Sequence, residues 1–464
     1  MSSWATRELQ SLDLGDVRRS RRLARMVATL TMHPSMSVPR AFQSKAEMNA
    51  AYYSWNSPYV TPQAIRAAHR DATVARLSTL PLVLVPNDTT NLDFTTHESV
   101  AGLGYLDGRG RFGLMCHTAT ALTPEGLMLG ILHQECWSRM PEEKGKSKDR
   151  AKLPLCEKES QKWVTTLDAV GAAVPETTVA VVVGDRESDV YGVFAHPRDA
   201  HVELLVRSAQ NRRLSRDTLL WETVEAEASC GTLTVEVGRA DGKPARQAQL
   251  TLRYKTVKVL AAKNAPGRKS LPGVEVQALL ALEEAPPAGT EPLRWFLLTT
   301  LAVSSGEDAA RVVGYYARRW SIERYHFVLK SGCKVEDLQL ESIDALETAL
   351  ATYSIVAWRL LHLTYQARLT PDAPCDLVFE PAEWEALCCR ISKKPTPPKK
   401  PPTLREAVRM VASLGGFLGR KSDGEPGVKT IWLGLGALHE SVEMYTAMRG
   451  IAPPRQHPRS CRER

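Results

Sequence analysis

The sequence predicts an α/β protein in which a central domain with an antiparallel β insertion is flanked by helical regions. Three observations predict this class. Short runs rich in Val and Leu recur between residues 82 and 300, as expected of strands covered on both faces. A period of two marks residues 231–260, and helical periodicity marks both ends of the chain. The 464 residues, 43% of them hydrophobic, suffice for about three domains.

Residues 1–72 are expected to form a small helical domain with a basic face. Apolar residues from Leu23 to Leu30 recur at helical spacing. Ten basic and four acidic residues give residues 1–70 a balance of +6, out of +8 for the whole chain. Clustered positive charge favours a polyanion such as nucleic acid, although solvated surface charge would also explain it. The arginines of the first helix are Arg18, Arg19, Arg21, Arg22 and Arg25.

Residues 73–345 are expected to form the central domain, with the β insertion at about 209–292 and a turn at 240–243. A helix is expected at 162–174. Buried strands are expected at 82–88, 179–185, 204–208 and 295–300.

Residues 346–464 return to helical periodicity and are expected to form a third domain. A Pro/Lys linker interrupts it at about 390–402. From Cys389 to Arg405 the chain holds six cations and no acid, and the tail is basic as well. Either a nucleic-acid contact or a stiff solvated linker would explain this stretch.

Several protein classes are excluded by composition. No run approaches the ~18 apolar residues that span a bilayer, and the first ten residues lack the apolar core of a signal peptide. The nine cysteines are scattered without a CxxC pair, which disfavours a disulfide framework or a zinc site. We therefore expect a reduced, cytoplasmic protein without a membrane partner.

Two aspartates end apolar runs of the central domain. Asp88 closes LVLVPND and Asp185 closes VAVVVGD. The carboxyl ends of strands are where an α/β sheet places its ligand-binding groups. Taken alone, either residue is also explained as a turn or helix-cap residue.

A helix after residue 300 is expected to present four polar side chains in one stripe. Ser304 and Glu307 would form its capping box. At 100° per residue, the four side chains fall within ~60° of one another. Surface ion pairs would be the simpler explanation, but bulky aromatic residues surround the stripe, so we expect a site that holds phosphate and metal together. The four residues are Tyr316, Arg319, Glu323 and Lys330.

These motifs resemble those of the DDE transposases of the insertion-sequence-four family, in particular the transposon-five type. The Y-x2-R-x3-E-x6-K signature of that family is present in full in YARRWSIERYHFVLK (316–330). Further similarity covers nearly the whole chain. It lies in LGDVRRSRRL (14–23), VPNDTTNL (85–92), GILHQECW (130–137), EKESQKW (157–163), GDRESD (184–189), LLVRS (204–208) and PLRWFLLTT (292–300).

The resemblance implies a ribonuclease-H-like mixed-sheet catalytic domain between a helical DNA-end-binding domain and a helical dimerisation domain. It implies that Asp88, Asp185 and Glu323 are the catalytic triad and ligate two Mg²⁺ ions, with Mn²⁺ as a substitute. Hard oxygen ligands without a His/Cys cluster suit those metals. Arg324 follows Glu323 where the family reference has a second acid, and Cys136 stands where it has Trp.

The resemblance also implies roles at the cut. Tyr316, Arg319 and Lys330 would hold the phosphates, since Arg binds them in a bidentate way and Lys as a point charge. Trp295 would stack a base that leaves the helix, with Trp320 and Arg207 in support, although a core position would also explain Trp295. Asp189 would support the site, and His133 and Glu135 would lie on a strand.

The implied activity is cut-and-paste transposition. A homodimer would bind the inverted repeats of the transposon ends in double-stranded DNA, nick the 3′ end, form and reopen a hairpin, and transfer the strand to target DNA. The protein would be cytoplasmic and associated with the bacterial nucleoid when bound to DNA. The alternatives are a metal-dependent nuclease of the same fold without strand transfer, and a non-catalytic regulator that occupies the ends.

Overall fold

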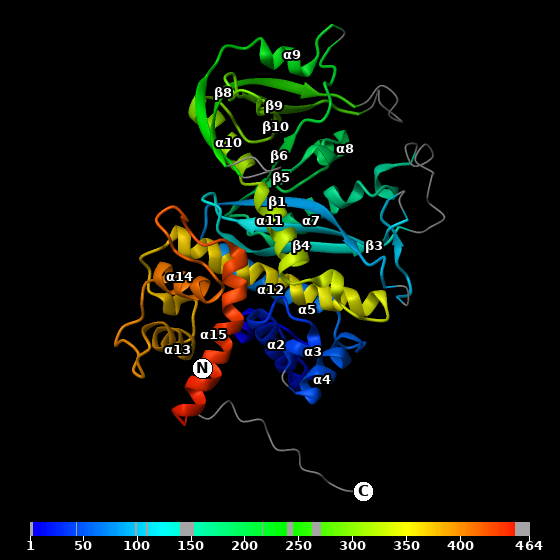
Figure 1. The fold of residues 1–464 in the computed structure, drawn as a ribbon. Coiled ribbons are helices and arrows are strands. Elements are labelled where there is room, and N and C mark those ends of the chain that lie inside the picture. The colour runs from blue at the N-terminus through cyan, green and yellow to red at the C-terminus, as the bar shows by residue number, and fades with distance from the viewer. Residues whose placement is uncertain are drawn as a thin grey trace. The chain divides into compact units, whose positions relative to one another are not determined.

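The computed structural model describes residues 3–42, 44–97, 100–107, 110–139, 153–215, 217–238, 245–261 and 271–450 (Figure 1). The chain forms two compact units. The first comprises Met1–Ala68, Phe327–Leu340 and Asp344–Arg464, and the second comprises His69–His326 and Glu341–Ile343. The turn expected at 240–243 and the basic tail lie outside the described residues.

The second unit is built on one ten-stranded mixed sheet. Its order is β2-β3-β1-β5-β6-β10-β9-β8-β7, and β4 pairs with β3 outside this path. β1, β5 and β6 are parallel, and every other pairing is antiparallel. The expected α/β class with a mixed sheet is confirmed. The strands are β1 (Leu82–Asp93), β2 (Gly104–Tyr105), β3 (Phe112–Leu122), β4 (Met128–Trp137), β5 (Val179–Gly184), β6 (Val202–Arg207), β7 (Gly231–Val237), β8 (Arg246–Val259), β9 (Val274–Leu282) and β10 (Arg294–Thr299).

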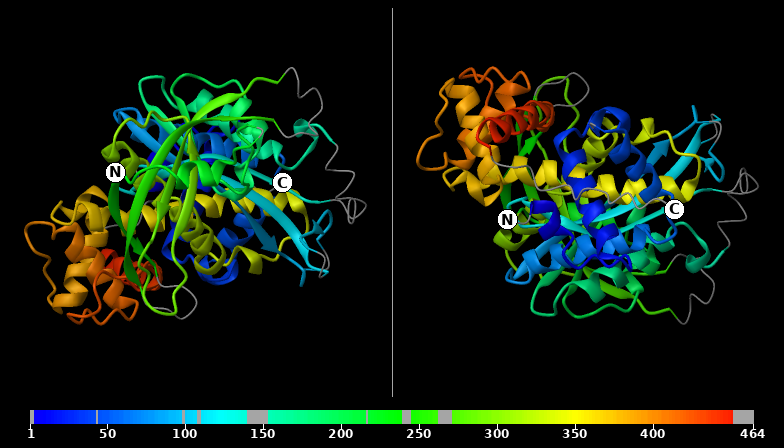
Figure 2. Two further views of the ribbon diagram at one scale, coloured as in Figure 1. Left: turned by 90° about the horizontal axis from the view of Figure 1, so that it is seen from above. Right: turned by 90° about the horizontal axis from the view of Figure 1, so that it is seen from below.

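The β insertion is a continuation of this sheet. β7 and β8 pair in antiparallel register, and β8 pairs with β9. β9 then pairs with β10, from Arg294↔Leu282 to Thr299↔Gln277, and β10 pairs with β6. The long strands of the insertion can be followed in the left view of Figure 2. The region whose sequence shows a period of two therefore forms the outer part of the same sheet.

Side-chain alternation divides the core of the second unit between the two faces of the sheet. On β5, Ala180 and Val182 join one hydrophobic cluster, whereas Val181 and Val183 join the other. The first cluster includes residues of α7 and the second includes residues of α10. The strands are thus apolar throughout because helices cover both faces. The helices are α7 (Gln161–Ala173), α8 (Tyr191–Ala195), α9 (Leu220–Glu225), α10 (Gly306–Ala317) and α11 (Trp320–Phe327), with short 3₁₀ turns at Leu155–Glu157 and Arg186–Ser188.

The first unit is helical and contains segments from both the N-terminal and the C-terminal part of the chain. α12 is buried along most of its length. Trp55 Nε1 donates to Thr352 Oγ1 on α12 at 3.2 Å, and Arg66 pairs with Glu347 at 3.3 Å. α5 (Pro62–Leu77) runs through the boundary predicted at residue 72, and the functional division into three domains stays a prediction. The helices are α1 (Trp4–Glu8), α2 (Val17–Met32), α3 (Val38–Ala41), α4 (Lys45–Trp55), α12 (Ile343–Leu369), α13 (Pro381–Ser392), α14 (Leu404–Leu414) and α15 (Val428–Met448).

Within the described part of the chain, no helix combines the length and the apolarity needed to cross a membrane. The eight cysteines described there are free thiols.

Two details of the sequence-based prediction are wrong. β1 does not end at Asp88 but continues to Asp93, because its antiparallel partner β3 extends the ladder after the parallel pairing with β5 stops at Pro86. The N-cap of α10 is Ser305 rather than Ser304. The Ser305 hydroxyl accepts from Asp308 N, while Ser304 hydrogen-bonds the Asp308 carboxylate.

The central strand β1 should be sensitive to loss of volume. Leu84 is fully buried, so Leu84→Ala is expected to lower the free energy of unfolding by about 2–5 kcal/mol. Leu271→Ala, at a site 40% exposed, should change it far less. Urea unfolding followed by circular dichroism measures both, and equal effects would contradict the assigned core.

Candidate active site

Asp88 lies on the face of the sheet that α10 covers. It shares this face with Leu84, four residues earlier on β1, since alternate residues of a strand point the same way. Its Oδ1 accepts a hydrogen bond from Thr89 N at 2.7 Å, and its side chain is 21% exposed. The carboxylate is therefore largely removed from water.

Asp185 follows β5 directly and opens a 3₁₀ turn. Its Oδ1 accepts from Glu187 N at 2.8 Å, and Ser188 Oγ donates to its carbonyl oxygen at 2.7 Å. Gly184 makes this tight turn possible, since a Cβ there would lie 2.2 Å from Ser188 Oγ. Asp185 is thus a cap residue, as one reading of the sequence allowed, and it also lies close enough to Asp88 to interact with it electrostatically.

Glu323 comes from α11, which is separate from α10. Arg318 and Arg319 form a turn between the two helices with i→i+3 hydrogen bonds, such as Arg319 N to Tyr316 O at 3.0 Å. The prediction of the stripe assumed one continuous helix, and this helix is not observed, because α10 ends at Ala317 and α11 begins at Trp320. Tyr316, Arg319 and Glu323 are nevertheless brought together, since Arg319 hydrogen-bonds both of the others.

Arg319 lies between two of the carboxylates. Its Nη2 is 2.8 Å from Glu323 Oε1, and its Nη1 is 3.7 Å from Asp88 Oδ2. The Arg319 side chain is only 8% exposed, so the pair with Glu323 is not the surface ion pair that the simpler explanation proposed. The guanidinium supplies positive charge where carboxylates from β1 and α11 converge.

The remaining negative charge perturbs Asp88. Burial, together with the charges of Asp185 and Glu323, raises the pKa of Asp88 to about 6, although the Thr89 N–H and Arg319 act in the opposite direction. A carboxylate held this way is stabilised by a cation, which would lower its pKa again. The donor set contains only carboxylate oxygens, which suits a hard divalent ion.

The residues fit such an ion chemically, but not in their present positions. Among the described residues, no three His, Cys, Asp or Glu side chains stand close enough together to hold a metal ion. Arg319 already pairs with two of the three carboxylates. A metal ion would therefore compete with Arg319 for the Asp88 and Glu323 carboxylates.

Two tryptophans near the carboxylates differ sharply in exposure. Trp295 is 7% exposed on β10 and packs edge-on against Tyr316, with ring centroids 5.2 Å apart. Trp320 is 55% exposed, with the Arg319 guanidinium 5.2 Å from its ring centroid. In this structure Trp320, rather than Trp295, offers an open aromatic face.

Tyr316 is nearly buried and lies between two guanidinium groups. Its hydroxyl hydrogen-bonds Arg207 and Arg319, and burial raises its pKa. Arg207, at the end of β6, also donates to Arg294 O at 3.2 Å. Tyr316 therefore orients arginines, and its 2% exposure leaves little surface for a direct contact with DNA.

Lys330 belongs to the first unit, in the π-helical turn Val328–Gly332. Its Nζ lies 3.1 Å from Glu336 Oε1. Its expected role beside the other three residues of the stripe stays a prediction.

The expected basic face of α2 is present in the first unit. Arg18, Arg19 and Arg22 line a hollow of about 220 Å³ with Tyr53 and Asp16. Within the described residues, no carboxylate pairs with Arg18, Arg21, Arg22 or Arg25. The Arg19 guanidinium lies 4.0 Å from the centroid of the Tyr59 ring. Unpaired arginines on one face are available for an anion.

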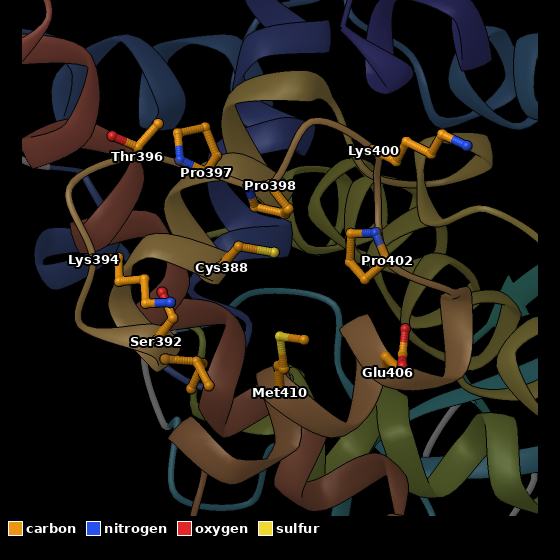
Figure 3. A pocket seen from close by; sticks show the side chains of 11 residues that line it. Cys388, Ser392, Lys394, Thr396, Pro397, Pro398, Lys400, Pro402, Glu406 and Met410 are labelled. Atoms are coloured by element: carbon orange, nitrogen blue, oxygen red, sulfur yellow. The ribbon is translucent and has the colours of Figure 1, made fainter.

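The stretch predicted as a Pro/Lys linker borders a second cavity. Residues 390–392 are the last turn of α13, and the following residues pass over a pocket of about 490 Å³ between α13 and α14 (Figure 3). Cys388 and Met410 face this pocket, and Lys394 and Lys400 lie along the stretch that closes it. The stretch therefore lies over helices of its own domain, with most of its side chains exposed.

Sequence reasoning named Asp189 but missed its partner Arg212, as well as Lys162 and Glu187. Asp189 is fully buried and pairs with Arg212 at 2.5 Å, while its other oxygen accepts from Ala209 N. It thereby fixes the loop after β6, and its supporting role stays a prediction. Lys162 Nζ lies 3.5 Å from Glu187 Oε2, beside the Asp185 turn. His133 and Glu135 lie on β4, as expected. The motif EKESQKW was the available signal for Lys162.

Comparisons with known proteins assign the chain. The family described as "Transposase DDE domain" matches residues 87–359, which is more than half of the chain. "Transposase DNA-binding" matches residues 1–60, and "Transposase Tn5 dimerisation domain" matches residues 355–451. The chain therefore belongs to the transposases with a DDE domain, which are DNA-binding, DNA-cleaving enzymes that depend on divalent metals.

One solved structure is similar in a weaker sense. It is a cryo-EM structure of a piggyBac transposase synaptic complex with hairpin DNA. It is 11% identical, with 98% of this chain and 76% of that chain covered and a TM-score of 0.32. The low TM-score and identity mean that this similarity does not show a shared fold or mechanism.

The pKa of Asp88 predicts a pH-dependent stability in the presence of a chelator. Since its folded pKa of about 6 exceeds the ordinary 3.8, its favourable contribution is complete below about pH 4 and is lost as the pH rises through 6. Asp88→Asn should therefore be more stable than the wild type above pH 6, by up to about 3 kcal/mol. Urea unfolding from pH 4 to 8 measures the difference, and a pH-independent gap would contradict the shift.

Proposed function

We propose that this protein is a cut-and-paste DNA transposase in which Asp88, Asp185 and Glu323 form the catalytic triad. The observation that carries the assignment is that Arg319 pairs with both Asp88 on β1 and Glu323 on α11, while Asp185, at the end of β5, acts electrostatically on Asp88. Isolated carboxylates would not be gathered at a partly buried site unless a cation joined them there. The mixed sheet and its order support a ribonuclease-H-like catalytic domain.

The triad would hold two Mg²⁺ ions, or Mn²⁺ in their place. Bound there, such ions would activate the attacking water or 3′-hydroxyl and stabilise the leaving oxygen. The chain's own contribution is to present carboxylate oxygens from three rigid elements. Arg319 and Arg207, oriented by Tyr316, would then hold the phosphates beside the cut. Lys330 would add a further cation to this set.

The order of steps would be a 3′ nick, attack of the new 3′-hydroxyl on the opposite strand to form a hairpin, reopening of the hairpin, and strand transfer. Hairpin formation bends the strand sharply and requires a base to leave the stack. Trp320 is the exposed aromatic group beside Arg319 and would receive that base. Trp295 would take part only if it left its buried position.

The ends of the element would be bound by the arginines of α2, whose side chains are not neutralised by carboxylates. The domain that matches the dimerisation family would pair two protomers in a synaptic complex with both ends. The resulting protein would act in the cytoplasm and join the nucleoid when bound to DNA.

The triad is tested by removing Glu323. Glu323→Ala is expected to reduce cleavage of end-containing DNA by about 10³-fold or more, because the site loses one of its three acidic groups. Binding of the same DNA, measured by gel shift, should not change. Glu307→Ala, at an exposed carboxylate of α10, serves as the matched control and should cleave normally.

Full cleavage by Glu323→Ala would overturn the triad. A target plasmid supplied to pre-cleaved ends separates the alternatives. Joined products identify a transposase, cleavage without joining identifies a nuclease, and binding without cleavage identifies a regulator.

The exposed tryptophan is tested against the buried one. Trp320→Ala should slow hairpin formation at least tenfold, since base stacking on an aromatic ring is worth about 1–3 kcal/mol, and should leave the first nick nearly unchanged. Trp295→Ala should lower stability by about 3–5 kcal/mol because it empties a core position. End-labelled DNA on denaturing gels separates the two steps. Equal slowing of nick and hairpin by Trp320→Ala would remove the stacking role.

A further inference from the structure

Three residues lie side by side in one row across β1, β3 and β4. Asp88 is directly opposite Thr118 on β3, and Thr118 is directly opposite Gln134 on β4. Directly opposed residues of antiparallel strands point to the same face of the sheet. The row therefore leads from the first carboxylate of the proposed triad to a buried amide two strands away.

Gln134 connects this row to α11. Its Nε2 donates to Thr118 Oγ1 at 3.1 Å and to the Tyr325 hydroxyl at 3.3 Å. Gln134 is 6% exposed, and Thr118 and Tyr325 are fully buried. Polar groups at such depth are destabilising if left without a partner, so the contacts hold the helix and the strands in one arrangement.

Tyr325 determines which way Glu323 points. The two residues are two positions apart on α11, about 200° around the helix axis. With Tyr325 held against the sheet, Glu323 must lie on another side of the helix, where its side chain is 37% exposed and reaches Arg319. A rotation of α11 would break the Tyr325 contact and move the Glu323 carboxylate away from Asp88.

We propose that Gln134 is a positioning residue of the acidic site, which fixes the rotation of α11 against β1 and so the separation of the Asp88 and Glu323 carboxylates. This inference rests on the proposed function. Gln134 would touch neither DNA nor metal. It would act through Thr118 and Tyr325, as groups behind a metal site orient the ligands in front of them.

The test measures Mn²⁺ binding to the full-length protein, by the electron paramagnetic resonance signal of the free ion. Gln134→Leu keeps a side chain of similar size without hydrogen bonds and should weaken Mn²⁺ binding about tenfold. Tyr325→Phe and Thr118→Val each delete one hydroxyl group and should shift binding in the same direction. Thr118→Ser keeps the hydroxyl and should restore it. The Mn²⁺ concentration for half-maximal cleavage should rise in parallel, with end binding unchanged.

Gln277→Leu is the matched control. Gln277 exchanges hydrogen bonds with Thr256 at 3.0 and 3.1 Å across β9 and β8, in a more exposed Gln–Thr pair of the same sheet. Its loss should leave Mn²⁺ binding unchanged. If Gln134→Leu fails to fold, the two single-hydroxyl deletions decide the result.

The outcomes are distinct. If Glu323→Ala abolishes Mn²⁺ binding but Tyr325→Phe and Thr118→Val bind as tightly as the wild type, the positioning role is overturned and the proposed function stands. If all of them lower stability without changing Mn²⁺ affinity, the network is structural only and the inference also fails. If Glu323→Ala binds Mn²⁺ and cleaves normally, the proposed function fails, and the positioning role fails with it.

Discussion

The site depends on one electrostatic constraint, which is that three carboxylates from distant parts of the chain must converge despite mutual repulsion. Burial and the neighbouring carboxylates raise the pKa of Asp88 to about 6, which is a consequence of this arrangement. Arg319 relieves part of the repulsion by pairing with Asp88 and Glu323. The guanidinium thus holds the Asp88 and Glu323 carboxylates together in the folded chain.

The sheet makes this convergence possible. Parallel pairing of β1 with β5 brings Asp88 and Asp185 to the same end of neighbouring strands, and antiparallel pairing with β3 continues β1 beyond Asp88 to Asp93. The strands of the insertion extend the sheet on its other side through β10. A wide, doubly covered sheet is a rigid support, so a helix packed on one face can present Glu323 toward Asp88.

Much of the framework was predictable from local pattern. The Val-rich runs marked β1, β5, β6 and β10, since strands covered on both faces have no polar alternation. The period of two marked β7 and β8. Asp185 was correctly placed after a strand, and the signature stripe indicated that Tyr316, Arg319 and Glu323 meet. β3 was not predicted, because its sequence FGLMCHTATAL mixes Thr and His with apolar residues, and those polar side chains find partners only in the fold.

By itself, the sequence determined which residue types stand at which strand ends and how they are spaced, because strand and helix periods depend on neighbouring residues alone. Only the tertiary structure decided that the stripe breaks into α10 and α11, that Trp295 is buried while Trp320 is exposed, and that Arg319 lies between two carboxylates. It also decided that Gln134 links Thr118 to Tyr325. These facts depend on contacts between residues far apart in the sequence, such as Asp88 and Arg319, and a local pattern carries no information about such contacts.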